Sequence, residues 1–574
     1  MDVSEIDDAA VAAAAWLADD PDPATQAELR EVLEAVASGD TDAVTDLADR
    51  MSGLLQFGTA GLRGRLGAGP HRMNRAVVIR AASGLSSYVT AQLGHPGTIV
   101  VGYDARHGST EFAHDTVAVA VAAGHRALLL PSALPTPVLA YAVRSLGADA
   151  GVMVTASHNP AWDNGYKVYL GASITPEAAG AQIVPPHDAG IAKLIEAVDA
   201  VAGVQRATSG WEIISPSIVD EYAAKVAALV AAPDGAAPDN TVAARRAALK
   251  VILTPIHGVG DATVRKALNA AGFLDLTSVP EQAEPDPDFP TVAFPNPEEP
   301  GAIDLALKLA TTINADVVIA NDPDTDRCAV ATVIDGDWRM LHGDVVGSLL
   351  GEHVAAAHAG QPYATLANSI VSSRQLAAIA KRHSLGHANT LTGFKWISRA
   401  PSLIYGYEEA LGYCVAPELV LDKDGVSTAV MIAEMVSELK AEGRALADAI
   451  DDLALDYGVY LSSQVSARFD DLSQIPVLMS RLLASPPSTL AGSPVIATDD
   501  MNKGFAGLPP TNGLHLAAES GARVIIRPSG TEPKVKAYLE VIEPVVGGDV
   551  RSARAAATDA MTALRADVER LLGV

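Results

Sequence analysis

Short apolar runs and helical periodicities alternate along the chain, and this pattern predicts its main elements. The runs TIVVGYD (98–104), RALLLP (126–131) and ADAGVMVTA (148–156) are predicted to be buried strands. Periodic apolar positions predict a helix that follows Ser109, its N-cap, and another over VLAYAVRSLG (138–147). Because strands and helices take turns, we expect a largely parallel sheet with helices on its faces.

The same pattern recurs farther along the chain. LKVILTPIHG (249–258) and ADVVIANDPDTDR (315–327) frame a second strand–helix–strand unit, and a looser version runs through 340–450. The segments at 232–240 and 284–300 are rich in proline, which cannot donate a ladder hydrogen bond, so both are predicted to be surface or extended loops.

The two ends of the chain differ from its middle. Residues 1–50 are acidic and amphipathic, and we expect helices there. From residue 456 onward the pattern predicts weaker strands, a glycine-rich loop and a terminal helix.

The length and the net charge of the chain limit its number of domains and its classes of binding partner. The chain has 574 residues, and a prior of about 150 residues per domain suggests about four domains. Charged residues make up 19% of the chain, so it is expected to be globular rather than disordered. Its net charge of −28 disfavours non-specific binding to nucleic acid or to an anionic membrane. A chain this acidic must gather positive charge locally if it handles an anionic substrate.

Cysteine usage and the N-terminus favour a cytoplasmic protein. Cys328 and Cys414 are the two cysteines, so no disulfide framework is expected. The acidic first residues lack the basic region of a signal peptide. No apolar run reaches the roughly 18 residues that a membrane span needs, so we expect no membrane partner.

Two loops carry the clearest candidate chemistry. TASHNP follows the predicted strand that ends near residue 156, so the hydroxyl of Ser157 is expected at the carboxyl end of a parallel sheet, where such sheets bind ligands. NDPDTDR follows another strand and spaces Asp322, Asp324 and Asp326 two residues apart. Carboxylates in this arrangement converge on a hard cation, and Mg²⁺ is the expected ion. An EF-hand is excluded because its sixth position would be Arg327 rather than glycine.

Four further loops add polar groups. GYEEALGY (406–413) offers paired glutamates for sugar hydroxyls, and RPSGTEPKVK (527–536) offers a guanidinium, hydroxyls and a glycine turn for a phosphate. FGTAGLRGRLG (57–67) and TGFKW (392–396) are glycine turns that carry Arg63 and Lys395. Each loop taken alone could be a plain polar turn, but the set together favours phosphoryl transfer on a sugar phosphate.

Through these loops the chain resembles the α-D-phosphohexomutase superfamily. TASHNP looks like its phosphoserine loop, DPDTDR like its metal loop, GYEEALGY like its sugar-binding loop, and RPSGTEPK like its phosphate-binding loop. The match runs in order from Phe57 to Lys536. The details FGTAGLRG, DNGYKVY, DPDFPTVAFPNPEE, GFKWI and EEALGY resemble the branch that holds phosphoglucomutase/phosphomannomutase-like and phosphopentomutase enzymes.

The resemblance implies an α/β fold of four domains around a central cleft, three related α/β domains and a smaller C-terminal α+β domain. We place the N-terminal arm and the phosphoserine-loop domain at 1–210 and the metal-loop domain at 211–335. The sugar-loop domain is placed at 336–455 and the phosphate-loop domain at 456–574.

The resemblance also implies roles for single residues. Ser157 would carry the phosphate, Lys167 would act in general acid/base transfer with its pKa lowered by nearby cations, and Arg63 and Arg327 would steady the phosphoryl group. His158 joins the catalytic candidates, although a residue adjacent to Ser157 is badly placed to be its base. Mg²⁺ would be held by the three aspartates together with an oxygen of phosphorylated Ser157. The substrate-binding candidates are Glu408, Glu409, Lys395, Arg527, Ser529, Gly530, Thr531 and Lys534.

The implied enzyme is an intramolecular phosphotransferase that interconverts sugar 1-phosphate and 6-phosphate, with glucose or mannose as the sugar. The reaction would pass through phosphoserine and a bisphosphorylated sugar, so a sugar 1,6-bisphosphate is the expected activator beside Mg²⁺. The partners expected are small-molecule sugar phosphates, with no nucleic acid, and the chain is expected as a monomer or homodimer.

Several alternatives remain open. Many hexose-specific relatives carry serine two residues after the first glutamate, where this chain has Ala410, so a phosphopentomutase acting on ribose or deoxyribose phosphates stays possible. A sugar 1,6-bisphosphate synthase would use the same loops. A phosphatase with the D-x-D-x-[TV] pattern would need Thr or Val in place of Asp326, and a non-catalytic sensor would be expected to lack the nucleophile or a metal ligand.

Overall fold

The computed structural model describes residues 3–56, 61–231, 240–469, 471, 473–528 and 534–574. The chain forms two compact units, each described here by itself. Unit 1 comprises Met1–Ala331 and Ala416–Glu434, and unit 2 comprises Thr332–Val415 and Met435–Val574. The division into four domains at residues 210, 335 and 455 stays a prediction.

The first sheet of unit 1 has its strands in the order β1-β5-β4-β2-β3-β7, with β6 paired to β5. Strands β2, β3 and β4 run parallel, whereas β5 is antiparallel to β4 and β1 is antiparallel to β5. The strands are β1 (Leu62–Arg65), β2 (Thr98–Tyr103), β3 (Arg126–Leu129), β4 (Ala150–Val154), β5 (Asp163–Leu170), β6 (Ala181–Gln182) and β7 (Glu212–Ile213). The three strands predicted between residues 98 and 156 are therefore present.

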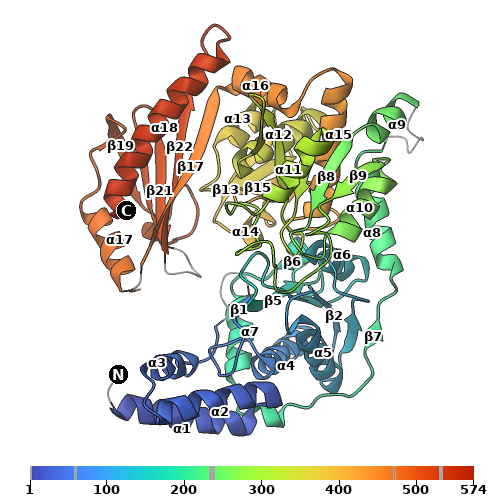
Figure 1. The fold of residues 1–574 in the computed structure, drawn as a ribbon, viewed down its shortest axis with the longest axis vertical. Helices are drawn as coiled ribbons and strands as arrows, with labels where there is room; N and C mark the ends of the chain where they lie inside the picture. The colour runs from blue at the N-terminus through green and yellow to red at the C-terminus, as the bar shows by residue number, and fades with distance from the viewer. Residues whose placement is uncertain (1–2, 57–60, 232–239, 470, 472, 529–533) are drawn as a thin grey trace. The chain divides into compact units, whose positions relative to one another are not determined.

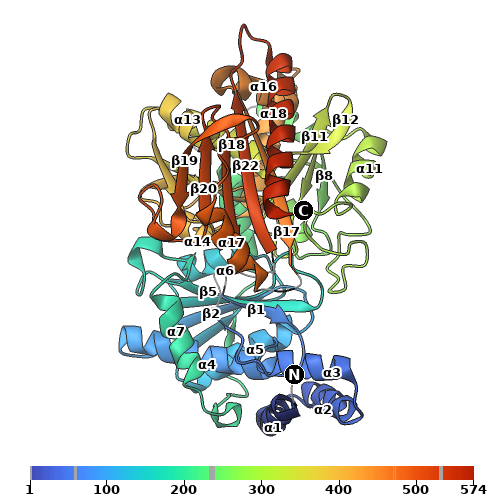
Figure 2. The same cartoon turned by 90° about the vertical axis from the view of Figure 1, so that its left-hand side faces the viewer.

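Helices cover both faces of this sheet. Figures 1 and 2 show α4 (Arg75–Leu93), α5 (Ser109–Ala122) and α7 (His187–Glu196) on one side and α6 (Thr136–Ser145) on the other. The start of α5 corrects one expectation, because Ser109 is its first residue rather than its N-cap, which is Gly108. The hydroxyl of Ser109 instead donates to Asp104 Oδ1 at 2.6 Å. The short helices η1 (Pro176–Ala178) and η2 (Val201–Gly203) follow β5 and α7.

Three N-terminal helices form an arm on unit 1, as the amphipathic pattern predicted. They are α1 (Val3–Asp19), α2 (Pro23–Ala37) and α3 (Thr41–Arg50). The carboxylates of Asp22 and Asp40 accept backbone N–H groups at the starts of α2 and α3, which satisfies donors that a helix start leaves unpaired. A small core of Ala13, Leu29 and Leu47 packs with Ala68 of the first α/β layer.

The second sheet has the order β12-β11-β10-β8-β9. Its strands are β8 (Lys250–Thr254), β9 (Asp275–Ser278), β10 (Val317–Ala320), β11 (Ala329–Ile334) and β12 (Asp337–Met340). The associated helices are α8 (Ser217–Ala228), α9 (Asn240–Ala247), α10 (Asp261–Ala270) and α11 (Asp304–Ile313). Residues 279–303 contain no helix or strand, which confirms the loop predicted at 284–300. Of the other predicted loop, residues 232–239 lie outside the described residues.

Unit 2 carries the third and fourth sheets. The third has the order β14-β13-β15-β16, with β13 (Thr365–Ser369), β14 (Gly386–Thr390), β15 (Leu403–Glu408) and β16 (Gly412–Cys414). Its helices are α12 (Gly343–Ala357), α13 (Gln375–Arg382), α14 (Phe394–Ile397), α15 (Gly425–Ala441, shared with unit 1) and α16 (Leu446–Tyr457).

The fourth sheet is antiparallel, in the order β17-β22-β21-β20-β19-β18. Its strands are β17 (Val459–Arg468), β18 (Thr489–Leu490), β19 (Ser493–Asp500), β20 (Leu514–Ala518), β21 (Arg523–Pro528) and β22 (Lys534–Glu543). The helices α17 (Gln474–Ala484) and α18 (Val550–Leu572) and the short η3 (Met501–Lys503) complete this part. Apolar residues of α17 and α18 share one core with the strands, so this is the α+β layer that the resemblance implied.

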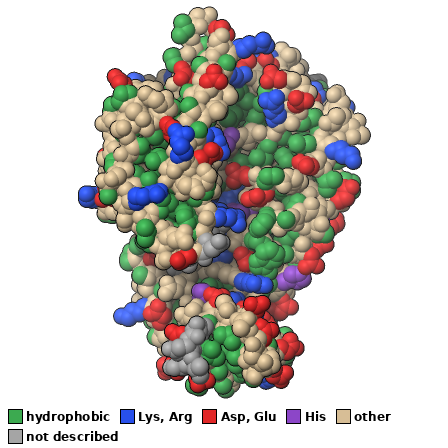
Figure 3. Space-filling view, turned by 60° about the vertical axis from the view of Figure 1, so that its left-hand side comes forward, with side chains coloured by type: hydrophobic (Ala, Val, Ile, Leu, Met, Phe, Trp, Pro, Cys, Tyr) green, Lys and Arg blue, Asp and Glu red, His purple; other side chains and the backbone are tan. Residues whose placement is uncertain are grey.

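Acidic side chains are spread over the face seen in Figure 3, in keeping with the net charge of −28. None of the helices in the described residues combines the length and the apolarity needed to cross a bilayer.

The arm offers a test of its packing. Leu29 is 0% exposed in the arm core, so Leu29→Ala should destabilise the arm by about 2–5 kcal/mol through lost contacts and a cavity. Hydrogen exchange should then accelerate in α1–α3 while β2 and β4 stay protected. The matched control is Val11→Ala on α1, since Val11 is 71% exposed. Equal exchange in the two variants would contradict the assignment of Leu29 to a core.

Candidate active site

Ser157 lies just beyond the carboxyl end of a parallel strand, as predicted. Strand β4 ends at Val154, and the Ser157 side chain follows in a buried loop, with the residue 2% exposed. Its backbone has a φ of 54°, in the left-handed region that non-glycine residues seldom adopt. The N–H of Ser157 donates to Thr155 Oγ1 at 2.9 Å. The loop therefore presents the hydroxyl in one defined backbone conformation.

Arg63 comes close to the same loop by way of a strand. We expected a glycine-rich loop over 57–67, but Leu62–Arg65 forms β1, where Arg63 pairs with Gly165 of β5. A Cβ at Gly165 would lie 2.6 Å from the carbonyl oxygen of Thr155, so only glycine permits this close approach. Residues 57–60 of the predicted loop lie outside the described residues.

The guanidinium of Arg63 has hydrogen-bonding capacity to spare. Its Nη1 donates to Asn159 Oδ1 at 3.1 Å, while its buried Nε donates to no acceptor among the described residues. Burial and the nearby charge of Arg327 lower its pKa. An anion beside Ser157 would both accept from Nε and offset this concentration of positive charge.

The three aspartates converge in one buried loop after β10. Asp322, Asp324 and Asp326 are 0%, 0% and 1% exposed, and each offers a carboxylate oxygen that lies within 4.8 Å of the others. Asn321 Nδ2 closes the loop by donating to the carbonyl of Arg327 at 2.7 Å. Burial, and then the charges of its two neighbours, raise the pKa of Asp322 to about 7. Lys167 instead helps hold the pKa of Asp324 and of Asp326 below the usual range, so Asp322 is the carboxylate whose charge a cation would relieve most.

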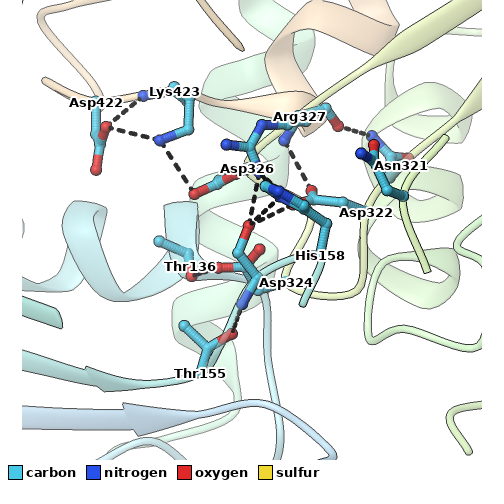
Figure 4. A network of polar contacts seen from close by, with 12 residues as sticks. Thr136, Thr155, His158, Asn321, Asp322, Asp324, Asp326, Arg327, Asp422 and Lys423 are labelled. Atoms are coloured by element: carbon cyan, nitrogen blue, oxygen red, sulfur yellow. Dashed lines mark hydrogen bonds and ion pairs between the residues drawn. The ribbon is translucent and has the colours of Figure 1, made fainter. Parts of the chain in front are cut away.

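Ser157 and the aspartate loop meet directly. Ser157 Oγ donates to Asp322 Oδ2 at 2.8 Å, and Arg327 Nη1 donates to Ser157 Oγ at 2.7 Å. Figure 4 shows His158 and Arg327 together beside Asp322, and Lys423 reaching towards Asp326. From α6, Thr136 Oγ1 donates to Asp324 Oδ2 at 2.7 Å, which fixes the loop against the first sheet.

His158 is placed as a neutral neighbour rather than a base. Its Nδ1 lies 3.3 Å from Ser157 Oγ and also contacts Arg327 Nη1. Burial and the charges of Arg327 and Arg63 hold its pKa well below the usual range. A neutral imidazole can accept a hydrogen bond from Arg327 without adding a further positive charge to the site.

Lys167 corrects a further expectation. It projects from β5, and its Nζ donates to Asp324 Oδ2 and to Asp326 Oδ2, both at 2.7 Å. Burial alone would lower the pKa of Lys167, but the two carboxylates outweigh burial and raise it. The expected lowering by neighbouring cations is therefore wrong for this arrangement, because the two carboxylates outweigh both burial and the charge of Lys423.

Lys423 joins the site although the sequence analysis did not single it out. It is 6% exposed, and its Nζ lies 3.3 Å from Asp326 Oδ2. Gly425 permits the approach of this segment, since a Cβ there would lie 2.4 Å from the carbonyl of Arg327. The signal in the sequence was LDKDG, a lysine between two acids and before a glycine.

The chemistry of the loop fits a divalent cation. Asp324 Oδ1 accepts no hydrogen bond from any described residue, although it is buried, and Asp326 Oδ1 likewise accepts none. Buried carboxylate oxygens without donors are costly unless an ion coordinates them. Lys167 and Lys423 hold the other oxygens of these residues, so a bound cation would share the carboxylates with two ammonium groups.

In unit 2, the two candidate glutamates differ in their surroundings. The predicted loop is in fact a β-hairpin, in which half-buried Glu408 ends β15 opposite Gly412 of β16. Glu409 lies in the turn, where its Oε2 accepts hydrogen bonds from Ser369 Oγ at 3.0 Å and from Ser372 Oγ at 2.9 Å. The turn is thus held in place through Glu409.

The remaining candidates of unit 2 lie on three elements. Lys395 is on α14, with its Nζ 5.7 Å from the Trp396 ring centre, and Arg527 is on β21 and donates to Thr392 Oγ1. Thr392, which lies just before α14, and Arg527 are therefore neighbours. Lys534 begins β22 opposite Arg468. Ser529, Gly530 and Thr531 lie outside the described residues.

Most of the chain matches models of one protein family. Residues 54–202, 221–333 and 342–457 match the models of alpha/beta/alpha domains I, II and III of phosphoglucomutase/phosphomannomutase, and residues 495–557 match the model of the C-terminal domain.

Relatives with different names are similar over nearly their whole length. A Haemophilus influenzae protein named "Probable phosphomannomutase" is 45% identical, covering 82% of this chain and 93% of that protein. A Staphylococcus epidermidis phosphoglucomutase is 33% identical over 85% of this chain and 90% of its own. Mouse phosphopentomutase is 32% identical over 93% of this chain and 90% of its own.

Solved structures share the fold. A phosphoglucomutase/phosphomannomutase family protein from Burkholderia thailandensis superimposes with a TM-score of 0.65 at 20% identity, over 90% of this chain and 97% of that one. The open form of pp63/parafusin, a Paramecium phosphoglucomutase, gives 0.67 at 15% identity, over 91% of this chain and 96% of that one.

The position of Lys167 generates a prediction about metal removal. Lys167→Met leaves Asp324 and Asp326 with less compensation, and breaking a buried ion pair costs about 3–5 kcal/mol. In EDTA the variant should therefore melt below the wild type, and saturating Mg²⁺ should raise its Tm by more than it raises that of the wild type. The control is Lys225→Met, at an exposed lysine of α8 in the same unit. Equal Mg²⁺ effects on all three proteins would argue against a cation site at these carboxylates.

Proposed function

This chain belongs to the phosphoglucomutase/phosphomannomutase family, and we propose from that premise that it interconverts the 1-phosphate and 6-phosphate of a hexose, glucose or mannose. Its family makes it a phosphomutase, an isomerase that moves a phosphoryl group between two oxygens of one sugar. The observation that carries the proposal is the meeting of Ser157 Oγ with Asp322 and Arg327 in a buried loop.

Ser157 is the proposed carrier of the phosphoryl group. Arg327 already donates to its oxygen, and the unused Nε of Arg63 is available close by for a phosphoryl oxygen. Guanidinium groups fit phosphate oxygens in fork geometry and offset the charge of the group in transfer. Positioning and charge stabilisation of this kind supply most of the catalysis in phosphoryl transfer.

Asp322, Asp324 and Asp326 are the proposed ligands of Mg²⁺. When bound, the ion would supply positive charge to the oxygens of the transferring group. Two neighbouring residues support these proposed ligands. Thr136 orients Asp324 through a hydrogen bond, and Lys423 balances the charge of Asp326.

Lys167 is the proposed proton donor to the sugar. Its raised pKa keeps the side chain protonated, so it is suited to give a proton to the sugar oxygen that leaves when a phosphoryl group passes to Ser157. The proton of the Ser157 hydroxyl would pass to Asp322, whose Oδ2 accepts its hydrogen bond. The opposite step needs the neutral amine, and cation binding at Asp324 and Asp326 would weaken the ion pairs that now favour the ammonium.

Unit 2 is proposed to bind the parts of the substrate that do not react. Glu408 would accept hydrogen bonds from sugar hydroxyls, with Glu409 fixing the turn beside it. Arg527, Lys395 and Lys534 would bind the second phosphate together with Ser529, Gly530 and Thr531. A sugar 1,6-bisphosphate is the proposed activator, because it would phosphorylate Ser157 and leave a sugar monophosphate.

A pentose phosphate is the second candidate substrate. Relatives named phosphopentomutase are 32% identical to this chain, and one named "Phosphoribomutase" from Saccharomyces cerevisiae is 33% identical over 92% of it. Ala410 favours this alternative, since it brings no hydroxyl to the turn between β15 and β16.

A side-by-side panel tests the proposal. Glucose, mannose, ribose and deoxyribose 1-phosphates are incubated with Mg²⁺ and a trace of the matching bisphosphate, and the products are followed by ³¹P NMR. We expect the fastest conversion for a hexose 1-phosphate, giving its 6-phosphate. Faster conversion of a pentose 1-phosphate would replace the hexose by the pentose, and net release of inorganic phosphate would contradict a mutase.

Two variants test the phosphoryl carrier and the sugar preference within the same substrate panel. Ser157→Ala removes the proposed carrier and should abolish turnover on every sugar while its Tm stays close to that of the wild type, because one small hydroxyl is lost. Ala410→Ser should raise the hexose-to-pentose ratio of kcat/KM by several fold, since one well-placed hydrogen bond is worth about 1 kcal/mol. Mutase activity of Ser157→Ala similar to the wild type would rule out this carrier.

A further inference from the structure

Arg106 holds the Ser157 loop through hydrogen bonds to its backbone. It lies three residues beyond the end of β2, at the same carboxyl edge of the sheet as Ser157, and is 4% exposed. One of its terminal nitrogens, Nη2, donates to the carbonyl oxygens of Ser157 and Asn159, each at 2.6 Å. The other, Nη1, donates to the carbonyls of Pro160 at 2.7 Å and Asp163 at 3.2 Å. A single side chain thus binds three carbonyls of the Ser157 loop and that of Asp163, where β5 begins.

This grip bears on the conformation of Ser157. A serine with a φ of 54° is held in a sparsely populated backbone region, which persists only where surrounding contacts enforce it. The carbonyl that Arg106 binds at 2.6 Å belongs to Ser157 itself. Displacement of the guanidinium would therefore release the residue whose hydroxyl must be aligned with Asp322 and Arg327.

Arg106 is in turn held by the proline-rich loop that the sequence analysis noted and that the proposed function leaves unused. The ring of Phe289 lies 5.0 Å from the Arg106 guanidinium carbon, in cation–π geometry, and Phe289 is 3% exposed. The loop is anchored beside it, because His107 Nε2 lies 2.8 Å from Asp288 Oδ1 and the N–H of Asp286 donates to the carbonyl of His257 at 3.0 Å.

The same unit contains a pair of similar chemistry that does not touch the loop. Phe273, 0% exposed, lies 5.8 Å from the buried guanidinium of Arg246. Arg246 donates to Glu434, to the Ala271 carbonyl and to the Val230 carbonyl. This pair therefore reports what the loss of a buried ring over an arginine does when only stability is at stake.

We propose that Phe289 is a positioning residue for phosphoryl transfer, acting through Arg106 on the backbone of the Ser157 loop. Its influence on turnover rests on the proposed function, whereas its influence on the loop does not. The loop at 284–300 then serves the reaction without contacting the reacting atoms, by fixing the plane of the guanidinium that binds the Ser157 carbonyl.

Phe289→Leu and Phe273→Leu are the matched test, because both remove a ring from a buried arginine and leave the β-carbon in place. With the preferred sugar 1-phosphate, Phe289→Leu should lower kcat about ten-fold or more and leave KM within two-fold, since small misplacements of reacting groups slow the chemistry strongly. Phe273→Leu should leave kcat within two-fold. Arg106→Lys, which keeps a charge but not the fork, should lower kcat at least as far as Phe289→Leu.

Hydrogen exchange supplies a readout that needs no turnover. The amides of peptide 155–165 should exchange about ten-fold faster in Phe289→Leu than in Phe273→Leu when each variant is measured at the same interval below its own Tm. The reason is that the N–H groups of Ser157 and Asn159 are hydrogen-bonded within this loop. Equal exchange in the two variants, or equal kcat, would overturn the proposal. If the wild type turned over none of the sugar phosphates, the proposed function would fail, and the exchange comparison would still decide the role of Phe289.

Discussion

Three carboxylates share one buried loop at Asp322, Asp324 and Asp326, and their mutual repulsion has to be offset before unit 1 can be stable. The offset is gathered from distant parts of the sequence. Lys167 arrives on β5 of the first sheet, and Lys423 arrives on a segment almost a hundred residues beyond the loop. The charge of this loop is therefore balanced by side chains from two other parts of the unit.

The same balanced charges surround the hydroxyl of Ser157. Its hydroxyl bridges an acceptor, Asp322, and a donor, Arg327, which belong to the two ends of the aspartate loop. Positive and negative groups are interleaved around the hydroxyl, since Arg327 Nη1 also donates to Asp322 Oδ2 at 3.2 Å. Such an arrangement suits the proposed exchange of an anionic group, because the arginine donors can offset its charge and the carboxylates can bind a cation.

Much of this could be predicted from the sequence. The apolar runs before TASHNP and DPDTDR predicted strands, and these are β4 of the first sheet and β10 of the second. The rule that ligands bind at carboxyl ends placed Ser157 correctly at the edge of the first sheet. The pattern failed where long-range pairing decides the outcome. Nothing local in FGTAGLRGRLG says that Leu62–Arg65 will pair with β5, and a lysine pKa cannot be foretold when its direction depends on which charges lie nearest. Arg106 and Lys423 were missed for the same reason, since their partners are remote in sequence.

The segment Ala416–Glu434 packs with unit 1, although the family model that covers it is that of domain III. Exchanging a whole domain between relatives would therefore also change the residues of this site. A chimera that took its third domain from another mutase would also import the residue that faces Asp326, together with the aspartates that Tyr169 and Tyr222 bind. Residues of the first two domains and of this segment are thus expected to change together during evolution, as parts of one charge balance inherited across a domain boundary.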